Sequence, residues 1–195
     1  SFDAGHTLLR ATPSVTHHYA DVLKNAGSRK SSTQIEEIVE ETLESFERKM
    51  FQEDLANKAS DDQEKARWSK VDQVIARKAG VTEDAKAVAD KIWEKFINPE
   101  HWEPYPETDR VLGVLRKSGY KVGGLSNWGT NLRKILAHHR LDAMLDFVII
   151  SAEVGVQKPS AEIFKATAKA AGVPLENLLH VGDQAEADFH GARNS

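Results

Sequence analysis

Four short segments of the 195-residue sequence carry side chains that could act together on an electrophile. They contribute the carboxylate of Asp3, the hydroxyl of Ser126, the ammonium group of Lys158 and the carboxylate of Asp183. Two neighbouring carboxylates repel each other and favour a divalent cation, and hard oxygen ligands suit Mg²⁺. The cation and Lys158 could neutralise a phosphoryl group, and Ser126 could donate a hydrogen bond to it. Unprotonated Asp3 could then attack as a nucleophile.

These segments follow short apolar runs in the second half of the chain, apart from Asp3, which stands near its start. Three runs have the length of strands: Tyr120–Leu125, Asp146–Ile150 and Leu178–Val181. Amphipathic helical patterns separate them, over Asp109–Lys117, Thr130–His138 and Ser160–Ala171. This alternation predicts βαβ units and a Rossmann-like parallel sheet, which binds ligands at the carboxyl ends of its strands. We therefore expect the four segments to meet at one edge of the sheet.

The stretch from Pro13 to Asn98 has a different pattern, because no strand-like run interrupts its helical spacing. Thr33 and Glu36 fit a capping box at the start of one helix. Behind them apolar residues recur at helical spacing, namely Ile35, Ile38, Val39, Leu43, Phe46, Met50 and Leu55. Asp61 opens a second helix, and Thr82 is expected to cap a third. The inward side chains of the second helix are predicted to be Trp68, Val71, Val74 and Ile75.

Prolines between Pro99 and Pro106 mark a linker that we expect not to be helical. The predicted fold class is therefore α/β, a parallel-sheet core with an inserted all-helical unit. Residues 1–12 and 100–195 would form the core, and residues 13–99 the insert. We interpret the tryptophans of the insert and linker as packing residues, namely Trp68, Trp93 and Trp102, with a role in lining the substrate site as the alternative.

The four chemical segments resemble, in order, the four motifs of the haloacid dehalogenase (HAD) superfamily of hydrolases. The matching segments are Asp3-Ala-Gly-His-Thr7, Leu125-Ser-Asn127, Lys158-Pro159, and Gly182-Asp183 with Asp188 five residues on. The segments Glu153–Pro159 and Leu179–Asp183 are similar to the subfamily with a helical cap between motifs one and two. The resemblance implies a Mg²⁺-dependent hydrolase, a phosphatase of a small phosphorylated metabolite that forms an aspartyl-phosphate intermediate. Residues 13–99 would then be the cap.

The resemblance also implies a role for each site residue. Asp3 would be the nucleophile, and Ser126 and Lys158 would assist catalysis. Ser126, Asn127 and Lys158 would bind the phosphate. The Mg²⁺ shell would contain Asp3, the backbone carbonyl of Gly5, Asp183 and Asp188.

The sequence departs from the family pattern at Gly5. Phosphatases of the family carry a second Asp at this position, which protonates the leaving group and then deprotonates the attacking water. Positioned acid–base groups are worth ~10²–10⁴-fold in rate, so Gly5 predicts a weaker enzyme. Adjacent His6 is a candidate substitute, because histidine titrates near neutrality. Two alternatives stay open: a catalytically impaired binding or regulatory protein, and a dehalogenase-type hydrolase that uses the same Asp3.

Composition excludes several other functions. The net charge of −4 gives no electrostatic reason to expect a nucleic-acid partner, and the absence of cysteine rules out thiolate catalysis and disulfides. No run of 18 apolar residues is present, so we expect no membrane partner and a soluble, cytoplasmic protein. We also expect a fragment of a longer chain, because Asp3 lacks a preceding apolar run and Gly191–Ser195 ends inside a helical pattern. The oligomeric state stays open.

Overall fold

The computed structural model describes the backbone of residues 1–52 and 58–195 and the side chains of residues 1–46 and 58–195. The side chains of Met50 and Leu55, which the sequence assigns to a helix face, lie outside these ranges. No helix of the described part is both long and apolar enough to cross a membrane.

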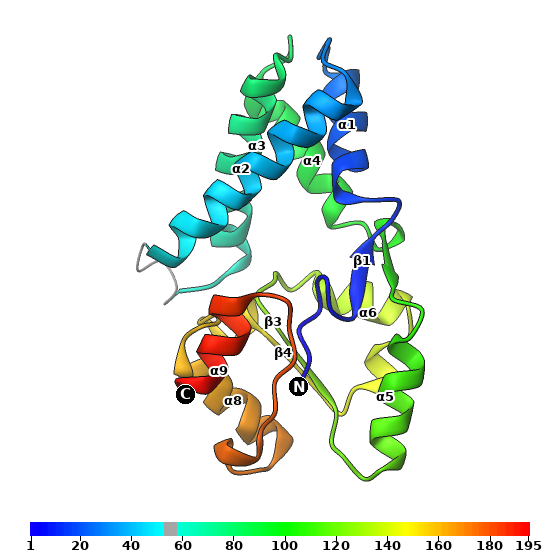
Figure 1. Ribbon diagram of the computed structural model, residues 1–195, viewed down its shortest axis with the longest axis vertical. Helices are drawn as coiled ribbons and strands as arrows, with labels where there is room; N and C mark the ends of the chain where they lie inside the picture. Colours follow the sequence, from blue (N-terminus) through cyan, green and yellow to red (C-terminus); the bar gives the residue numbers. More distant parts are fainter. Residues whose placement is uncertain (53–57) are drawn as a thin grey trace.

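A small parallel sheet organises the lower half of the molecule (Figure 1). Strands β3 (Gly123–Ser126) and β4 (Phe147–Ile150) pair in parallel, from Gly123 opposite Phe147 to Ser126 opposite Ile150. Phe2 forms single parallel bridges to Gly124 on one side and to Val181 on the other. The segments around Val181 and Phe2 therefore continue the sheet beside β3 and β4, and the expected parallel core is confirmed.

The sheet is shorter than the sequence predicts. Leu178–Val181 does not form a strand, because only Val181 makes a bridge and Leu179 is 77% exposed. This segment is the last of the four and has a paired neighbour on one side only. β3 begins at Gly123, after Tyr120, whose side chain is also exposed.

Helices cover both faces of this sheet. Leu112 of α5 (Thr108–Lys117) and Ile135 of α6 (Leu132–His138) belong to one hydrophobic cluster. Ile163 and Phe164 of α8 (Ala161–Ala171) pack with Leu125 of β3 in another. The shorter elements are α7 (Ser151–Val154), α9 (Gly191–Arg193), 3₁₀ turns at Pro99–His101, Asp142–Met144 and Leu175–Asn177, and a π-helical turn at Ala185–His190.

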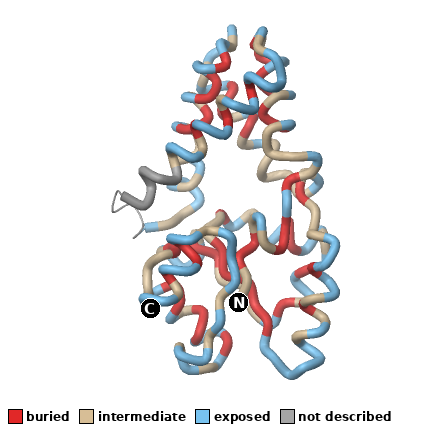
Figure 2. The backbone as a smooth tube through the Cα atoms, viewed as in Figure 1, coloured by how far each residue is buried: buried red, intermediate tan, exposed pale blue. Residues whose placement is uncertain are grey.

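The upper half is helical and has a hydrophobic cluster of its own (Figures 1 and 2). It consists of α1 (Val15–Asn25), α2 (Ser32–Gln52), α3 (Asp61–Ala79) and α4 (Ala85–Phe96). Side chains such as Tyr19, Ile35, Ile75 and Ile92 fill this cluster. The separate hydrophobic cluster of the helical half supports the proposed division into a core and a helical cap at residues 13–99.

Two of the predicted helix caps are wrong. The capping box of α2 pairs Ser31 with Gln34. The backbone N–H of Gln34 donates to Ser31 Oγ at 3.2 Å, and the backbone N–H of Ser31 donates to Gln34 Oε1 at 2.9 Å. Thr33 therefore lies inside the helix. The side chain of Asp84 caps α4, and Thr82 instead donates to the carbonyl of Ala26. Val74, predicted to face inward, is 40% exposed because the inward face of α3 centres on other residues.

The chain crosses between the two halves through a two-stranded antiparallel ribbon. β1 (Leu9–Ala11) leaves the core, and β2 (Trp102–Pro104) returns to it, with Ala11 opposite Trp102. The prediction of a wholly non-helical linker is wrong at its start, since Pro99 opens a 3₁₀ turn. Proline is tolerated there because the first helical residues need no backbone donor.

Candidate active site

The first site residue, Asp3, is placed by the sheet. The N–H of Phe2 donates to Gly123 O and the N–H of Leu125 donates to Phe2 O, both at 2.8 Å. The N–H of Asp3 donates to Val181 O, also at 2.8 Å. These bonds align Asp3 with the ends of β3 and of the Val181 segment. Ser126 is the last residue of β3, and Asp183 lies two residues after Val181, so the predicted meeting at one edge is confirmed for these three residues.

A buried ammonium group joins two of the carboxylates. Lys158 is 2% exposed, and its Nζ donates to Asp3 Oδ1 and to Asp188 Oδ1, each at 2.6 Å, and to Leu125 O at 3.2 Å. Buried charges are tolerated only where partners compensate the lost hydration. Here the two carboxylates and the carbonyl satisfy all three donors of the ammonium.

Asn127 has a supporting position. Its side-chain oxygen accepts from the N–H of Lys158 at 2.7 Å, and its Nδ2 donates to the carbonyl of Lys158 at 2.9 Å. The amide thus fixes the backbone that carries the ammonium group. Asn127 also lines the cavity described below, but its side-chain amide is engaged by Lys158.

Asp188 is buried and fully engaged. Oδ1 accepts from Lys158 and from His180 Nε2 at 2.8 Å, and Oδ2 accepts from the N–H of Gln184 at 2.9 Å. Burial alone would raise the pKa of Asp188, but the hydrogen bond of His180 and the bond and charge of Lys158 outweigh it and hold the pKa at about 2. Asp188 lies inside the turn Ala185–His190, so it does not cap a helix that begins after it.

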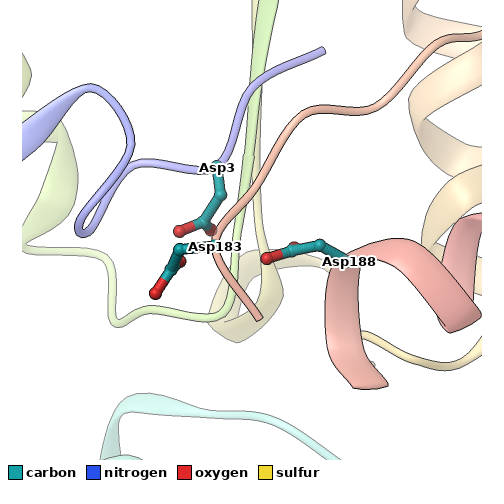
Figure 3. Close-up of side chains that lie close together, drawn as sticks. All are labelled: Asp3, Asp183 and Asp188. Carbon is teal, nitrogen blue, oxygen red and sulfur yellow. The ribbon is translucent and has the colours of Figure 1, made fainter. Parts of the chain in front are cut away.

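Asp183 completes a group of three carboxylates. Oxygens of Asp3, Asp183 and Asp188 lie within 4.8 Å of one another (Figure 3). Desolvation by the surrounding protein, followed by the negative charge of Asp3, raises the pKa of Asp183, although the residue as a whole is exposed. Repulsion of this kind is relieved by a divalent cation, and the donors are the hard oxygens that Mg²⁺ prefers. The residues present therefore fit Mg²⁺.

Gly5 has a structural partner that the sequence does not reveal. An ideal Cβ built on Gly5 would lie 3.1 Å from Cζ3 of Trp128, so the indole ring covers the position of a side chain there. Adjacent His6 has a left-handed backbone with φ of 55°. Its side chain is exposed, lines the cavity and lies close enough to Asp183 to affect the pKa of that carboxyl.

A cavity of about 250 Å³ opens between the strand ends and the helical half. Its floor is polar and includes Asp3, Ser126, Lys158 and Asp183. Its upper wall is largely aromatic and includes Tyr19, Phe46, Trp68, Trp93, Phe96 and Trp102. The three tryptophans that the sequence assigns to packing thus also face the cavity.

The family follows from comparison with known proteins. The model of a family described as haloacid dehalogenase-like hydrolase matches residues 1–195. This chain belongs to the haloacid dehalogenase-like hydrolase family. The resemblance carried by the four motifs is confirmed, and this HAD-like hydrolase is an enzyme of that class.

Relatives of this HAD-like hydrolase include Haloacid dehalogenase-like hydrolase domain-containing protein 3 of Danio rerio, 27% identical over 99% of this chain and 79% of that protein. Glyceraldehyde 3-phosphate phosphatase of Methanopyrus kandleri is 30% identical over an aligned part that covers 63% of this chain and 53% of that protein. The HAD-hydrolase YfnB from Bacillus subtilis, whose structure was solved with bound magnesium, has the same fold. Its TM-score is 0.73 at 16% identity, over 99% of this chain and 81% of that one.

Sequence reasoning missed two residues of this HAD-like hydrolase that contact or face the site. His180 holds Asp188, and its position three residues before Asp183 is a signal that could have found it. Glu64 of α3 lines the cavity from the helical side. Its spacing of four residues from Trp68, and of eight from Asp72, places all three on one helix face and could have indicated it.

Proposed function

We propose that this HAD-like hydrolase is a Mg²⁺-dependent phosphatase of a small phosphorylated metabolite. The observation that carries the proposal is the meeting of Asp3, Asp183 and Lys158 on the floor of one cavity. A nucleophilic carboxylate beside a buried cation is suited to an anionic, electrophilic group. Relatives named glyceraldehyde 3-phosphate phosphatase and phosphoserine phosphatase support the same reaction class.

In this proposal each residue of the site has its own role in the reaction. Ser126 donates a hydrogen bond to an oxygen of the phosphoryl group, the positive charge of Lys158 offsets the negative charge of that group, and Asp3 attacks phosphorus. The bond from phosphorus to the leaving oxygen breaks as the aspartyl-phosphate forms. Water then attacks the phosphorus of this intermediate, releases inorganic phosphate and restores the carboxylate. Asp188 and Asn127 act by holding Lys158 in place.

The carboxylates of Asp3 and Asp183, with the carbonyl of Gly5, would hold the metal. When bound, Mg²⁺ would supply positive charge beside the phosphoryl oxygens and reduce the repulsion between the carboxylates. We assign Asp188 a supporting position, because both of its oxygens already accept hydrogen bonds from protein donors.

The test of the proposed function is a panel of phosphorylated metabolites assayed with saturating Mg²⁺ and with chelator. We expect phosphate release from at least one compound, and its loss both in chelator and in Asp3→Asn. Asp142→Asn, on an exposed 3₁₀ turn of the core, is the matched control and should keep full activity. Release of halide from a 2-haloacid, without phosphatase activity, would contradict the proposal and favour the dehalogenase alternative.

Asp183→Asn tests the metal ligands directly. We expect it to weaken Mg²⁺ binding at least about tenfold, because it removes the charge of one ligand and the repulsion that the cation relieves. Isothermal titration calorimetry of the purified variant measures this without any substrate. Unchanged Mg²⁺ affinity in a folded Asp183→Asn protein would show that the ion does not bind at this carboxylate.

A further inference from the structure

The residue that carries this inference is Glu64, on the cavity-facing side of α3. Its Oε2 atom is fully buried and has no hydrogen-bond partner within the described part of the chain. A buried carboxyl oxygen without a partner is costly and is rarely kept by a folded protein without a use. Glu64 lines the same cavity as Asp3, Ser126 and Lys158.

Several contacts dock the start of α3 on the core and place Glu64 there. Asp61 accepts from the N–H and the hydroxyl of Thr130 at 2.7 and 2.6 Å. Arg67 donates to the side chain of Gln157, the neighbour of Lys158, at 3.1 Å. A Cβ built on Gly129 would lie 2.6 Å from Glu64 Oε2, so the carboxyl packs directly against the core backbone beyond β3. Glu64 is thereby held at the junction of the two halves.

The geometry of substitution at phosphorus shows what this position can do. The attacking and leaving oxygens lie roughly in line on opposite sides of phosphorus. Asp3 attacks from the floor of the cavity, so the leaving oxygen departs toward the opposite wall, which the helical half provides. Position 5, the usual source of an acid in the family, is a glycine covered by Trp128.

We propose that Glu64 is the acid–base catalyst of this enzyme and works from the helical half in place of the side chain that Gly5 lacks. This inference rests on the proposed phosphatase function. In the first step the protonated Glu64 carboxyl donates its proton to the leaving oxygen as the P–O bond breaks, and an alcohol is released. In the second step the Glu64 carboxylate accepts a proton from the water that attacks the aspartyl-phosphate. The two steps return the carboxyl to its starting state.

The protonation of Glu64 suits this role. The pKa of Glu64 is raised to about 8, mainly by burial; the positive charge of Arg67 opposes this shift, and the negative charge of Asp61 adds to it. The core loop packed against it, residues 128–131, carries no charged side chain. The carboxyl is therefore mostly protonated at pH 7. Its pKa is close enough to that pH for the group both to donate a proton and to accept one during the reaction.

The other buried acid of the cavity is a weaker candidate. Asp72 lies two turns further along α3, and its pKa is raised to about 7, mainly by burial. However, the hydroxyl of Tyr19 donates to Asp72 Oδ1 at 2.7 Å. Asp72 thus has a partner within the helical half, whereas Oε2 of Glu64 has none in the described structure.

The test compares Glu64→Gln with wild type on two substrates, 4-nitrophenyl phosphate and an alkyl phosphate such as glycerol phosphate. An alkoxide is a poor leaving group and needs the proton, whereas 4-nitrophenolate does not. We expect kcat/KM for the alkyl phosphate to fall ~10²–10⁴-fold, and kcat/KM for the aryl phosphate to change little. The loss of wild-type alkyl phosphatase activity above about pH 8 should also disappear from the profile of the variant. Glu37→Gln, at an exposed position of α2, should change neither substrate.

Equal effects of Glu64→Gln on both substrates, or no effect on either, would overturn the assignment of Glu64 while leaving the phosphatase function intact. A wild-type enzyme that hydrolyses no phosphate ester would overturn both.

The melting temperature, measured without substrate, tests the buried neutral state of Glu64 independently of activity. The raised pKa means that folding favours the neutral acid, so Glu64 stabilises the fold most below pH 4.5 and loses this contribution as pH rises through about 8. Glu64→Gln should therefore melt at a higher temperature than wild type at pH 9, and no difference there would count against a buried neutral Glu64.

Discussion

Lys158→Met should both destabilise this enzyme and remove most of its activity. The variant leaves Asp3 and Asp188 without the ammonium group that bonds each of them at 2.6 Å in a buried position. Breaking a buried ion pair from one side costs ~3–5 kcal/mol, because the remaining charge stays buried without its partner. Loss of the cation beside the phosphoryl group should lower kcat/KM by a further ~10²–10³-fold in the folded fraction.

Urea unfolding in chelator measures the stability of Lys158→Met, and the same titration in saturating Mg²⁺ should recover part of the loss, because a bound cation again offsets the carboxylates. Lys165→Met is the matched control. Lys165 forms an exposed pair with Glu162 on the outside of α8, and such pairs contribute 0–1 kcal/mol. A Lys158→Met protein as stable as Lys165→Met would mean that the three carboxylates do not depend on the ammonium group.

Gly5→Asp should raise the turnover of alkyl phosphates, and most strongly in a chain that also carries Glu64→Gln. In that background we expect a gain of up to ~10²–10⁴-fold, because the new carboxyl supplies the proton that Glu64 no longer provides. Position 5 is outside the left-handed backbone region, so an aspartate meets no backbone strain there. It does meet Cζ3 of Trp128 at 3.1 Å from its Cβ, and this ring must shift by a few tenths of an ångström. Trp128 is only partly buried, which permits such a shift.

The control for Gly5→Asp is Gly5→Ala, which sets the same Cβ against Trp128 without a carboxyl group. The rates of the two variants in steady-state assays, with the melting temperature of each, separate the chemical effect from the packing effect. In the Glu64→Gln background, a folded Gly5→Asp protein no faster than Gly5→Ala would show that a carboxyl group at position 5 does not supply the proton in this site.

The floor of the site could be predicted from the sequence because strand ends are local features. A short apolar run followed by Ser126, or by Gly182 and Asp183, indicates where a side chain emerges, and parallel pairing brings the ends together. The strand at Leu178–Val181 was overpredicted for a related reason. Apolar content predicts burial, but this segment has a neighbour on one side only, and its apolar residues Leu179 and Val181 are exposed.

The upper wall could not be predicted in the same way. Whether Glu64 faces solvent or a cavity depends on how α3 docks on the core, through contacts such as Asp61 with Thr130, 69 residues apart. The engagement of Asn127 with Lys158, and the position of Trp128 over Gly5, depend on tertiary contacts as well. The spacing of residues along the sequence identifies candidates of this kind, but it does not show which of them face the cavity or contact the site.

The β1–β2 ribbon has a consequence for how this architecture can change. Because Ala11 pairs with Trp102, the chain leaves the core and re-enters it at points about 5 Å apart. The whole helical half is therefore, in topological terms, the loop of a β-hairpin. A tight two-residue turn could join the same two strands, so the core tolerates exchange of everything between them without moving its sheet. A lineage could thus replace one substrate-facing module with another and leave Asp3, Lys158 and Asp183 where they are.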